Sequence, residues 1–172
     1  MHRSVWLAAA SAALVFAATA AMPQSAQAGA MVGFSGNYSA GTIVVKTGER
    51  SLYYVLGNGR AMRYSVGVGR QGKQWTGTSS IDGKHLAPAW SPPADVKRDN
   101  PKLPAVIAGG SPRNPMGAAA LTLDGEDYAI HGTNSPRSIG GFVSYGCIRM
   151  TNPDILDLYA RVRVGTPVVV ER

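Results

Sequence analysis

One histidine and one cysteine in the C-terminal part of the chain have the residue types and the setting for covalent catalysis. His131 ends an apolar stretch, and Cys147 follows within Ser144-Tyr145-Gly146-Cys147. A thiol acts as a nucleophile in its thiolate form, which a neighbouring imidazole stabilises as an ion pair. Gly146 allows a substrate carbonyl to approach closely, and the backbone N–H groups around Cys147 are then placed to hold an oxyanion. These residues predict acyl transfer through a thioester.

Cys147 is the single cysteine of the chain. Small exported proteins usually pair their cysteines in disulfides, because an unpaired thiol is open to oxidation outside the cytoplasm. A cysteine without a partner is therefore either a small buried hydrophobic residue or a reactive group. The sequence around Cys147, with His131 upstream, favours the reactive group.

The reason to regard the protein as exported lies in its first 28 residues. Met1–Arg3 form a short basic start, residues 5–22 are almost uniformly apolar, and Ala26-Gln27-Ala28 is a small-residue site of the kind that signal peptidase cuts. An uncleaved membrane anchor is the alternative, but it needs about 20 strongly apolar residues, and this stretch is mostly alanine. We expect a signal peptide over residues 1–28, one domain over residues 29–172, and no transmembrane anchor after cleavage.

Composition and charge argue against several other classes of protein. The chain has 172 residues, 45% of them hydrophobic, and a formal net charge of +7, which indicates one folded domain. The basic excess either attracts anionic polymers of the cell envelope or is only a solvated surface. The basic residues are scattered, so no nucleic-acid partner is expected. His85, His131 and Cys147 are too far apart in sequence for a typical zinc site, so no metal is expected.

The glycine-rich segment Gly67–Gly72 has the spacing of a dinucleotide-binding fingerprint. That fingerprint needs a helix directly after it, because the helix N-terminus holds the pyrophosphate. The following residues, Lys73–Thr78, do not resemble a helix start. The segment is therefore interpreted as a bend, and no cofactor is expected.

The elements that must position His131 and Cys147 are mostly strands. Runs of branched and aromatic residues separated by turn residues predict strands at Ile43–Lys46, Ser51–Leu56, Ala61–Val66, Ala119–Leu123, Tyr128–His131 and Pro167–Val170. Gly57-Asn58-Gly59 predicts a hairpin between the second and third of these. Gly132, Gly140 and Gly141 suit a loop that folds back and brings His131 beside Cys147.

Two further segments complete the expected fold. Asn152 as N-cap, Pro153 in the first helical position and apolar residues on one face predict a helix that ends near Val162. Residues 87–117 carry seven prolines and little periodicity. Because structureless loops of this length in compact domains are usually functional, we expect a long ordered loop or a lid.

The C-terminal motif resembles that of the L,D-transpeptidases of bacterial cell walls, with the ErfK/YbiS/YkuD type of catalytic domain. The matching segments are His131-Gly132-Thr133-Asn134, Ser144-x-Gly146-Cys147-Ile148-Arg149-Met150, the helix after Asn152 and Gly165-Thr166-Pro167-Val168. Upstream segments, including Val68-Gly69-Arg70-x-Gly72-Lys73-x-Trp75 and Pro88-x-Trp90, resemble the Gram-negative branch of the family. The resemblance covers nearly all of the chain after the signal.

The resemblance implies a mainly β, sandwich-like domain of the YkuD type, located in the periplasm, with Cys147 as nucleophile and His131 as general base. The family attacks the carbonyl of the third residue of a peptidoglycan stem peptide, usually diaminopimelate, and releases the terminal D-Ala. The acyl group then passes to an amine, which belongs to a second stem peptide or to an envelope protein. Carbapenem-type inhibitors are expected to react with such a site, and no cofactor is implied.

The same resemblance assigns roles to the residues around the pair. Arg149 would position the substrate or brace the site, with Ser144, Tyr145 and Asn134 as further substrate contacts. The backbone groups expected at the oxyanion and the imidazole are those of Gly146, Cys147 and Gly132. The family often has histidine where this chain has Tyr145, but His131 occupies the position usually assigned to the base.

Two other functions fit the same residues. A hydrolase of this fold would use water as the acceptor and cut peptidoglycan cross-links or links between peptidoglycan and protein. A non-catalytic wall-binding module would need neither His131 nor Cys147, so their presence argues against it. Among the plainer interpretations, Arg149 could pair with Asp154 or a loop carboxylate, and Trp75 and Trp90 could serve packing.

Overall fold

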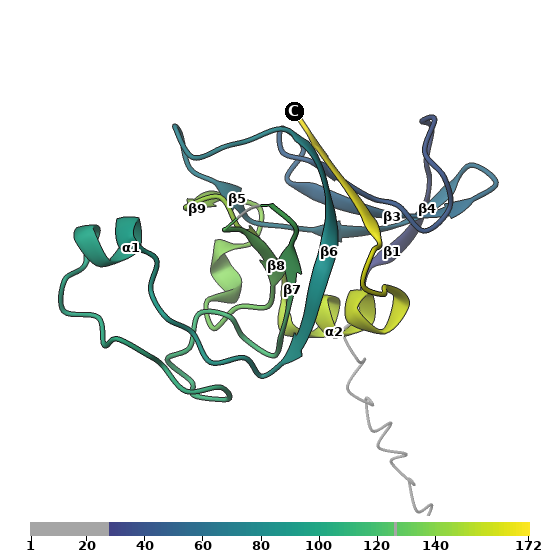
Figure 1. Cartoon of the computed structure of the whole chain (residues 1–172). Helices are drawn as coiled ribbons and strands as arrows, with labels where there is room; N and C mark the ends of the chain where they lie inside the picture. Colours follow the sequence, from purple (N-terminus) through teal and green to yellow (C-terminus); the bar gives the residue numbers. More distant parts are fainter. Residues whose placement is uncertain (1–27, 126) are drawn as a thin grey trace, which may run out of the picture.

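Nine strands form one continuous sheet that folds over into two layers in the computed structural model, which describes residues 28–125 and 127–172 (Figure 1). Their order across the sheet is β1-β4-β3-β2-β11-β6-β7-β8-β10, and β5 and β9 form a separate parallel pair. The strands are β1 (Ala30–Gly33), β2 (Ile43–Lys46), β3 (Ser51–Gly57), β4 (Arg60–Ser65), β5 (Val68–Gly69), β6 (Gly77–Leu86), β7 (Ala119–Leu123), β8 (Ala129–His131), β9 (Phe142–Ser144), β10 (Ile148–Arg149) and β11 (Pro167–Glu171). The mainly β, sandwich-like fold expected from the sequence is thus confirmed.

Strand β6 joins the two layers. Its first residues, Gly77–Ser80, pair with β11, and the rest, from Ile81 onward, pairs with β7 after a shift in register between Ile81 and Gly83. The sequence analysis missed this ten-residue strand. Only Ile81 within it is buried, so β6 lacks the apolar alternation that identifies a half-buried strand.

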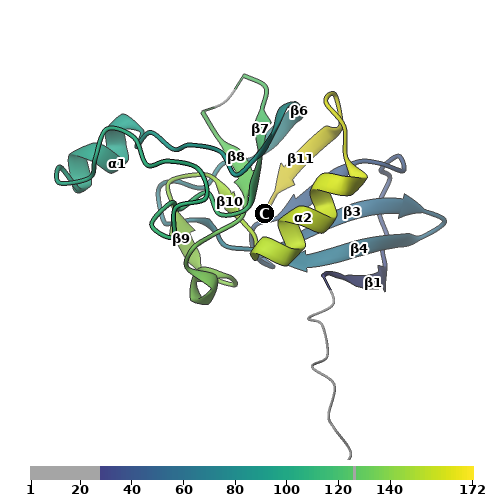
Figure 2. The ribbon, with the colours of Figure 1, turned by 90° about the horizontal axis from the view of Figure 1, so that it is seen from below.

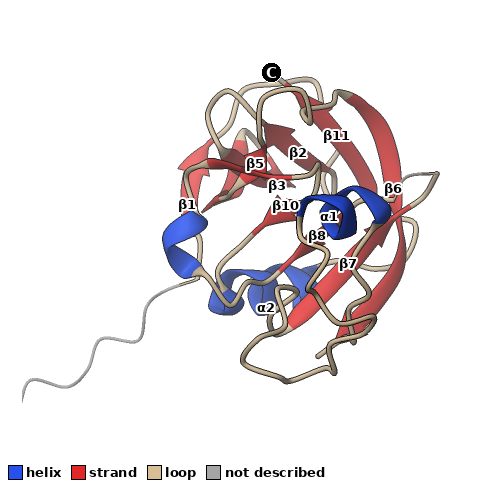
Figure 3. Cartoon of the chain, turned by 90° about the vertical axis from the view of Figure 1, so that its left-hand side faces the viewer, coloured by secondary structure: helices blue, strands red, loops and turns tan. Residues whose placement is uncertain are grey.

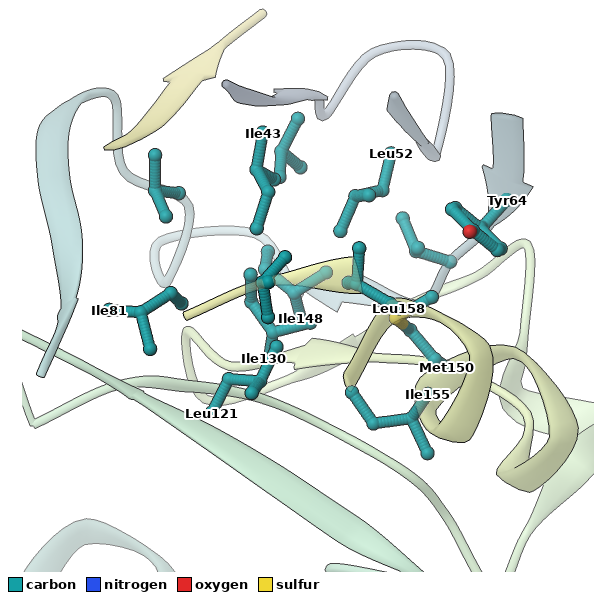
Figure 4. Close-up of a cluster of buried hydrophobic side chains, with 14 of the residues drawn as sticks. Ile43, Leu52, Tyr64, Ile81, Leu121, Ile130, Ile148, Met150, Ile155 and Leu158 are labelled. Carbon is teal, nitrogen blue, oxygen red and sulfur yellow. The ribbon is translucent and has the colours of Figure 1, made fainter. Parts of the chain in front are cut away.

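The core lies between the layers and is closed on one side by helix α2 (Asn152–Arg161) (Figure 2). Residues from both layers and from α2 converge there, including Leu52, Ile130 and Leu158, each with no exposed surface (Figure 4). Ile148 and Met150 fill the same core from the segment that follows Cys147. The dense packing of these side chains fixes the backbone directly after the candidate nucleophile.

The N-cap predicted for α2 is wrong by one residue. Thr151 is the N-cap, and its hydroxyl accepts a hydrogen bond from the backbone N of Asp154 at 3.3 Å. Asn152 instead turns its side chain away from the helix, where Oδ1 accepts from the backbone N of Ala118 and of Thr133. Thr and Asn are both good caps, so the local pattern alone does not choose between them.

The proline-rich segment 87–117 contains one regular element, the short helix α1 (Ala94–Asp99), which the sequence analysis did not predict. The rest of the segment is held by Asn114, whose Nδ2 donates to the carbonyls of Pro88 and Ala108 at 2.8 and 3.0 Å. Figure 3 shows α1 in front of β8 and β10. These hydrogen bonds hold the long loop, and Pro93, Ala94 and Asp95 within it line a cleft together with Cys147.

The other predicted strands are confirmed to within a residue or two, as is the hairpin at Gly57–Gly59. The predicted signal peptide falls almost entirely on residues 1–27, which lie outside the described residues. Within the described part of the chain, no helix has the length and apolar character that crossing a bilayer requires.

Candidate active site

The parallel pairing of β8 and β10 places His131 and Cys147 on one face of the sheet. Ile148 lies opposite Ile130, and both point into the core (Figure 4). Because side chains alternate along a strand, His131, Cys147 and Arg149 point to the other face, under the proline-rich segment. In this register Cys147 lies opposite Ala129, two residues before His131. From ordinary strand spacings, the backbones of Cys147 and His131 are then ~8 Å apart.

His131 is buried, with 4% of its surface exposed. Its Nδ1 lies 2.6 Å from the carbonyl oxygen of Gly132. Since a carbonyl only accepts, Nδ1 carries the hydrogen, and Nε2 of the neutral ring is left with a free lone pair. Burial lowers the pKa of His131 to about 4, and nearby carbonyl groups offset this only in part. The imidazole is therefore a neutral base at physiological pH.

Cys147 is half-buried and free. Burial raises the pKa of its thiol, while the backbone N–H groups of Ala129 and Cys147 and the charge of Arg149 act to lower the pKa. Because burial dominates, the resting site holds a protonated thiol and a neutral imidazole. This differs from the ion pair expected from the sequence, since both groups lose more from desolvation than they gain from neighbours.

The protonated state of the Cys147 thiol predicts how its rate of alkylation depends on pH. We expect alkylation of Cys147 by iodoacetamide to accelerate roughly tenfold per pH unit between pH 6 and pH 8.5, because only the thiolate reacts and its fraction grows at that rate below the pKa. The rate is measured by mass spectrometry across pH 5–10. A rate that is already constant below pH 7 would indicate a preformed thiolate and contradict this assignment.

Gly146 and Ser144 shape the turn that presents Cys147. Gly146 has a φ of +129°, and a Cβ at this position would lie 2.2 Å from Cε1 of Tyr128. Ser144 is buried; its hydroxyl donates to the carbonyl of Cys147 at 2.6 Å and accepts from the backbone N of Gly146 at 3.2 Å. The N–H of Gly146 therefore already donates to Ser144. The N–H groups of Ala129 and Cys147 face the sulfur instead, and they are the better placed donors for an oxyanion.

Trp75 and Tyr128 brace the same turn from outside. Their rings stack with centroids 5.3 Å apart, and the indole Nε1 of Trp75 donates to the carbonyl of Gly146 at 3.0 Å. This hydrogen bond fixes the peptide bond that precedes the nucleophile. Trp75 therefore serves packing and positioning, in line with the plainer interpretation of this tryptophan.

A cleft of about 350 Å³ opens at Cys147. It is lined by Lys73, Pro93, Ala94, Asp95, Asp127, Tyr128, Tyr145 and Cys147. The start of α1 thus forms one wall, and the catalytic segment forms the other. Since the walls carry an ammonium and two carboxylates, the cleft suits a charged, polar ligand.

Acidic residues of α1 hold this wall to the rest of the site. Asp99 accepts from Arg70 at 2.8 Å and from the hydroxyl of Tyr145 at 2.5 Å. The guanidinium of Arg70 also lies 4.0 Å from the centroid of the Tyr145 ring. Asp95 forms a salt bridge with Lys73. Hydrogen bonds from these partners hold the pKa of both carboxyls below the usual value, so α1 stays anchored by ionised groups at neutral pH.

Removing one anchor is expected to loosen α1. Asp99→Asn should raise the rate at which a bulky maleimide labels Cys147 by about 2–5-fold, because exposed ion pairs contribute little individually. Glu49→Gln is a matched control, since Glu49 also accepts from a tyrosine hydroxyl and pairs with a lysine, but on the far layer. Labelling that is equally fast in both variants and the parent protein would show that α1 does not restrict access.

One of the predicted substrate residues lies elsewhere than expected. Asn134 donates to the carbonyl of Pro112 at 3.1 Å and lines a different cavity, of about 350 Å³, beside Asn152. Arg149 forms no ion pair within the described residues, and its Nε is buried without a hydrogen-bond partner there. The proposed pairing with Asp154 is wrong, because that carboxylate accepts from the backbone N of Gly29 instead.

Sequence reasoning missed the groups that reach the site from outside the motif. The ring of Tyr128 and the backbone N–H of Ala129 reach the turn at Cys147 from the start of β8. The charged residues of α1 approach through the proline-rich segment, whose composition gave no helix signal. Within the described ranges, no cluster of three or more His, Cys, Asp or Glu side chains is arranged to hold a metal ion.

Comparison with known proteins identifies the family of the chain. Residues 40–170 match the model of the YkuD family, described as the L,D-transpeptidase catalytic domain. The chain is similar to the probable L,D-transpeptidase YbiS of Escherichia coli strain K12, with 40% identity over 135 residues, which cover 73% of this chain and 43% of that protein. The chain thus spans less than half the length of this relative.

Solved structures share the fold at low sequence identity. An L,D-transpeptidase from Mycobacterium smegmatis has a TM-score of 0.59 and 18% identity, with 76% of this chain and 58% of that chain covered. The L,D-transpeptidase LdtMt1 in complex with imipenem has a TM-score of 0.57 and 14% identity, with 75% and 57% covered. From the family match and the identity to YbiS, the chain belongs to the L,D-transpeptidase family.

Proposed function

We propose that this protein is a cysteine-dependent L,D-transpeptidase of the bacterial cell wall. The observation that carries the proposal is a lone thiol that opens into a cleft and shares one sheet face with a buried, neutral imidazole. The donor is a tetrapeptide stem of peptidoglycan, the leaving group is D-Ala, and the acceptor is an amine of a second stem or of an envelope protein.

In the first half of the reaction, the sulfur of Cys147 attacks the donor carbonyl while Nε2 of His131 takes the thiol proton. The oxyanion that forms accepts hydrogen bonds from backbone N–H groups near the sulfur. The C–N bond to D-Ala then breaks, and the imidazolium returns its proton to the leaving nitrogen. The products are a thioester on Cys147 and free D-Ala.

In the second half, the acceptor amine attacks the thioester and gives a proton to His131. The C–S bond breaks, and the sulfur recovers a proton as the new amide forms. Because the imidazole is neutral at rest, each half-reaction begins and ends in the same charge state. The site therefore needs no metal or redox group to balance either step.

Arg149 has the charge to hold a substrate carboxylate near the thioester. Its side chain lies on the same sheet face as Cys147, and its Nε has no protein partner within the described part of the chain. A carboxylate that accepted from this guanidinium would satisfy the buried group. Ser144 and Tyr145 support the site more indirectly, by fixing the turn and anchoring α1.

The test uses the purified protein, a defined tetrapeptide donor and an amine acceptor, with products identified by mass spectrometry. Cross-linked dimers with release of D-Ala support the proposal. Trimmed tripeptide without dimer, at saturating acceptor, would instead show a hydrolase. Binding to sacculi without any release of D-Ala would show a wall-binding module.

Inhibition gives a second test of the thiol. Imipenem is present in the LdtMt1 complex, and a carbapenem is expected to acylate Cys147 here in the same way that a donor would. A mass increase equal to the inhibitor, located on the peptide that contains Cys147, supports the assignment. The periplasm is the expected compartment, and fractionation of cells that express the whole chain tests it.

A further inference from the structure

The amino-terminal end of the described chain contacts the helix that follows the catalytic motif. The backbone N of Gly29 lies 3.0 Å from Oδ1 of Asp154, in the first turn of α2. Strand β1 then begins at Ala30 and pairs with β4 at the edge of the sheet (Figure 2). A cavity of about 290 Å³ opens at this contact, lined by Gly29, Ala30, Arg63, Tyr64, Ser65 and Asp154.

Position 29 accommodates only glycine. Its φ is +65°, and a Cβ there would lie 2.6 Å from Cε1 of Tyr64 and 3.2 Å from Cε of Met62. Tyr64 cannot easily yield, because it is 1% exposed and its hydroxyl donates to Asp157 at 2.5 Å. The hydrogen bond to Asp154 and the pairing of β1 with β4 directly after it place the nitrogen of Gly29 beside a carboxylate.

The residues directly before Gly29 are Ala26-Gln27-Ala28, the small-residue pattern that signal peptidase cuts. Hydrolysis after Ala28 consumes one water, breaks the C–N bond, and leaves a carboxylate on Ala28 and an amino group on Gly29. Given the cut after Ala28 that the sequence predicts, we propose that the new ammonium group of Gly29 forms an ion pair with Asp154. This inference does not depend on the transpeptidase activity.

Cleavage would replace the amide N–H that donates to the carboxylate of Asp154 by an ammonium group, so a hydrogen bond with one charged partner becomes an ion pair. The second charge adds a Coulomb attraction to the hydrogen bond. The bond acts at the start of α2, where Asn152 holds the backbone of Thr133 and so the loop after His131.

Other groups also face the new ammonium. Arg63 lines the same cavity, but its guanidinium donates to Ser51 through two nitrogens, at 3.1 and 3.0 Å. Tyr64 lines the cavity as a neutral phenol, and burial raises the pKa of its hydroxyl. Asp154 is therefore the only carboxylate among the residues that line this cavity. Its negative charge attracts the ammonium group, while the positive charge of Arg63 repels it.

The first experiment locates the cut. The full-length precursor is expressed in a Gram-negative host, and the exported protein is analysed by intact mass and N-terminal sequencing. We expect Gly29 as the first residue. Any other first residue would overturn the proposal, whatever activity the protein shows.

The second experiment measures the ion pair in the processed chain and in the same chain with Ala28 retained, which moves the amino group outward by one residue. Every contact described above lies within residues 28–172. Asp154→Asn should lower the Tm of the chain that begins at Gly29 by about 2–4 °C at pH 6. The same substitution should lower the Tm less than half as much in the chain with Ala28 retained, because the ammonium group there lies farther from Asp154. Effects of Asp154 on the helix itself are equal in the two chains and cancel in the comparison.

The sign of the pH dependence follows from the charges. The protonated amine is the form that Asp154 stabilises, so the added stability is present below the ordinary α-amino pKa of about 8 and is lost as the pH rises past it. If Asp154→Asn does not fold, acetylation of Gly29 removes the same charge and should give the same loss at pH 6. Equal losses in both chains, or a Tm unaffected by acetylation, would overturn the ion pair.

Discussion

Replacing Cys147 by alanine is expected to abolish release of D-Ala, with a rate at least about 10⁴-fold below that of the parent protein, because the substitution removes the atom that forms the thioester. No other thiol is present in the chain to take its place. The measurement is D-Ala release from a tetrapeptide donor, together with the intact mass after incubation with a carbapenem. The alanine variant should show no mass increase.

The same variant should fold normally. Cys147 is half-buried and its side chain lines an open cleft, so truncation to alanine leaves no closed cavity. The turn around residue 147 is fixed by Gly146, Ser144 and Trp75, none of which bonds to the sulfur. We expect a Tm within about 2 °C of the parent. Substantial D-Ala release by a folded Cys147→Ala protein would rule out the thioester mechanism.

Cys147→Ser separates nucleophile chemistry from shape. Serine keeps a polar atom of similar size, but its hydroxyl is far less acidic than a thiol. The base here is weak, because burial lowers the pKa of His131 to about 4 and its Nδ1 faces a carbonyl instead of a carboxylate. We therefore expect this variant to be nearly as inactive as alanine. Residual hydrolysis above the alanine level would show that His131 is a stronger base than its burial implies.

Some of this site could be predicted from the sequence because the information is local. The pair of His131 and Cys147, the glycine before the thiol and the strand that ends at the histidine all lie within one short stretch. Strands β2, β3 and β4 were also predictable, since each carries several buried branched or aromatic residues. Local spacing and local hydrophobicity are sufficient for such features.

Other features depend on the tertiary fold. The charge states of His131 and Cys147 follow from burial under the proline-rich segment, which no local pattern around either residue indicates. The anchoring of α1 depends on Asp99 meeting Tyr145, 46 residues away. Strand β6 pairs with β7 and β11, which both lie far along the chain from it. In each case the deciding contact is long-range.

The second large effect is expected at His131. His131→Gln should lower the rate of D-Ala release by about 10³-fold, the usual range for loss of a positioned general base. Glutamine retains a hydrogen-bonding side chain but has no lone-pair nitrogen that can take the thiol proton. His85→Gln is the matched control, because His85 is an exposed histidine on β6 and lines a different cavity.

The pH profile distinguishes a lost base from a lost structure. With a neutral imidazole as base and its pKa near 4, activity of the parent protein should fall as the pH drops toward 4, because protonation of the ring removes the acceptor. The glutamine variant should lose this acidic limb and instead gain activity with rising pH, as the thiolate forms without help from a base. A variant that was merely misfolded would be inactive at every pH. Retention of both the acidic limb and the parent rate in His131→Gln would show that another residue accepts the proton, and Cys147 would then need a different partner.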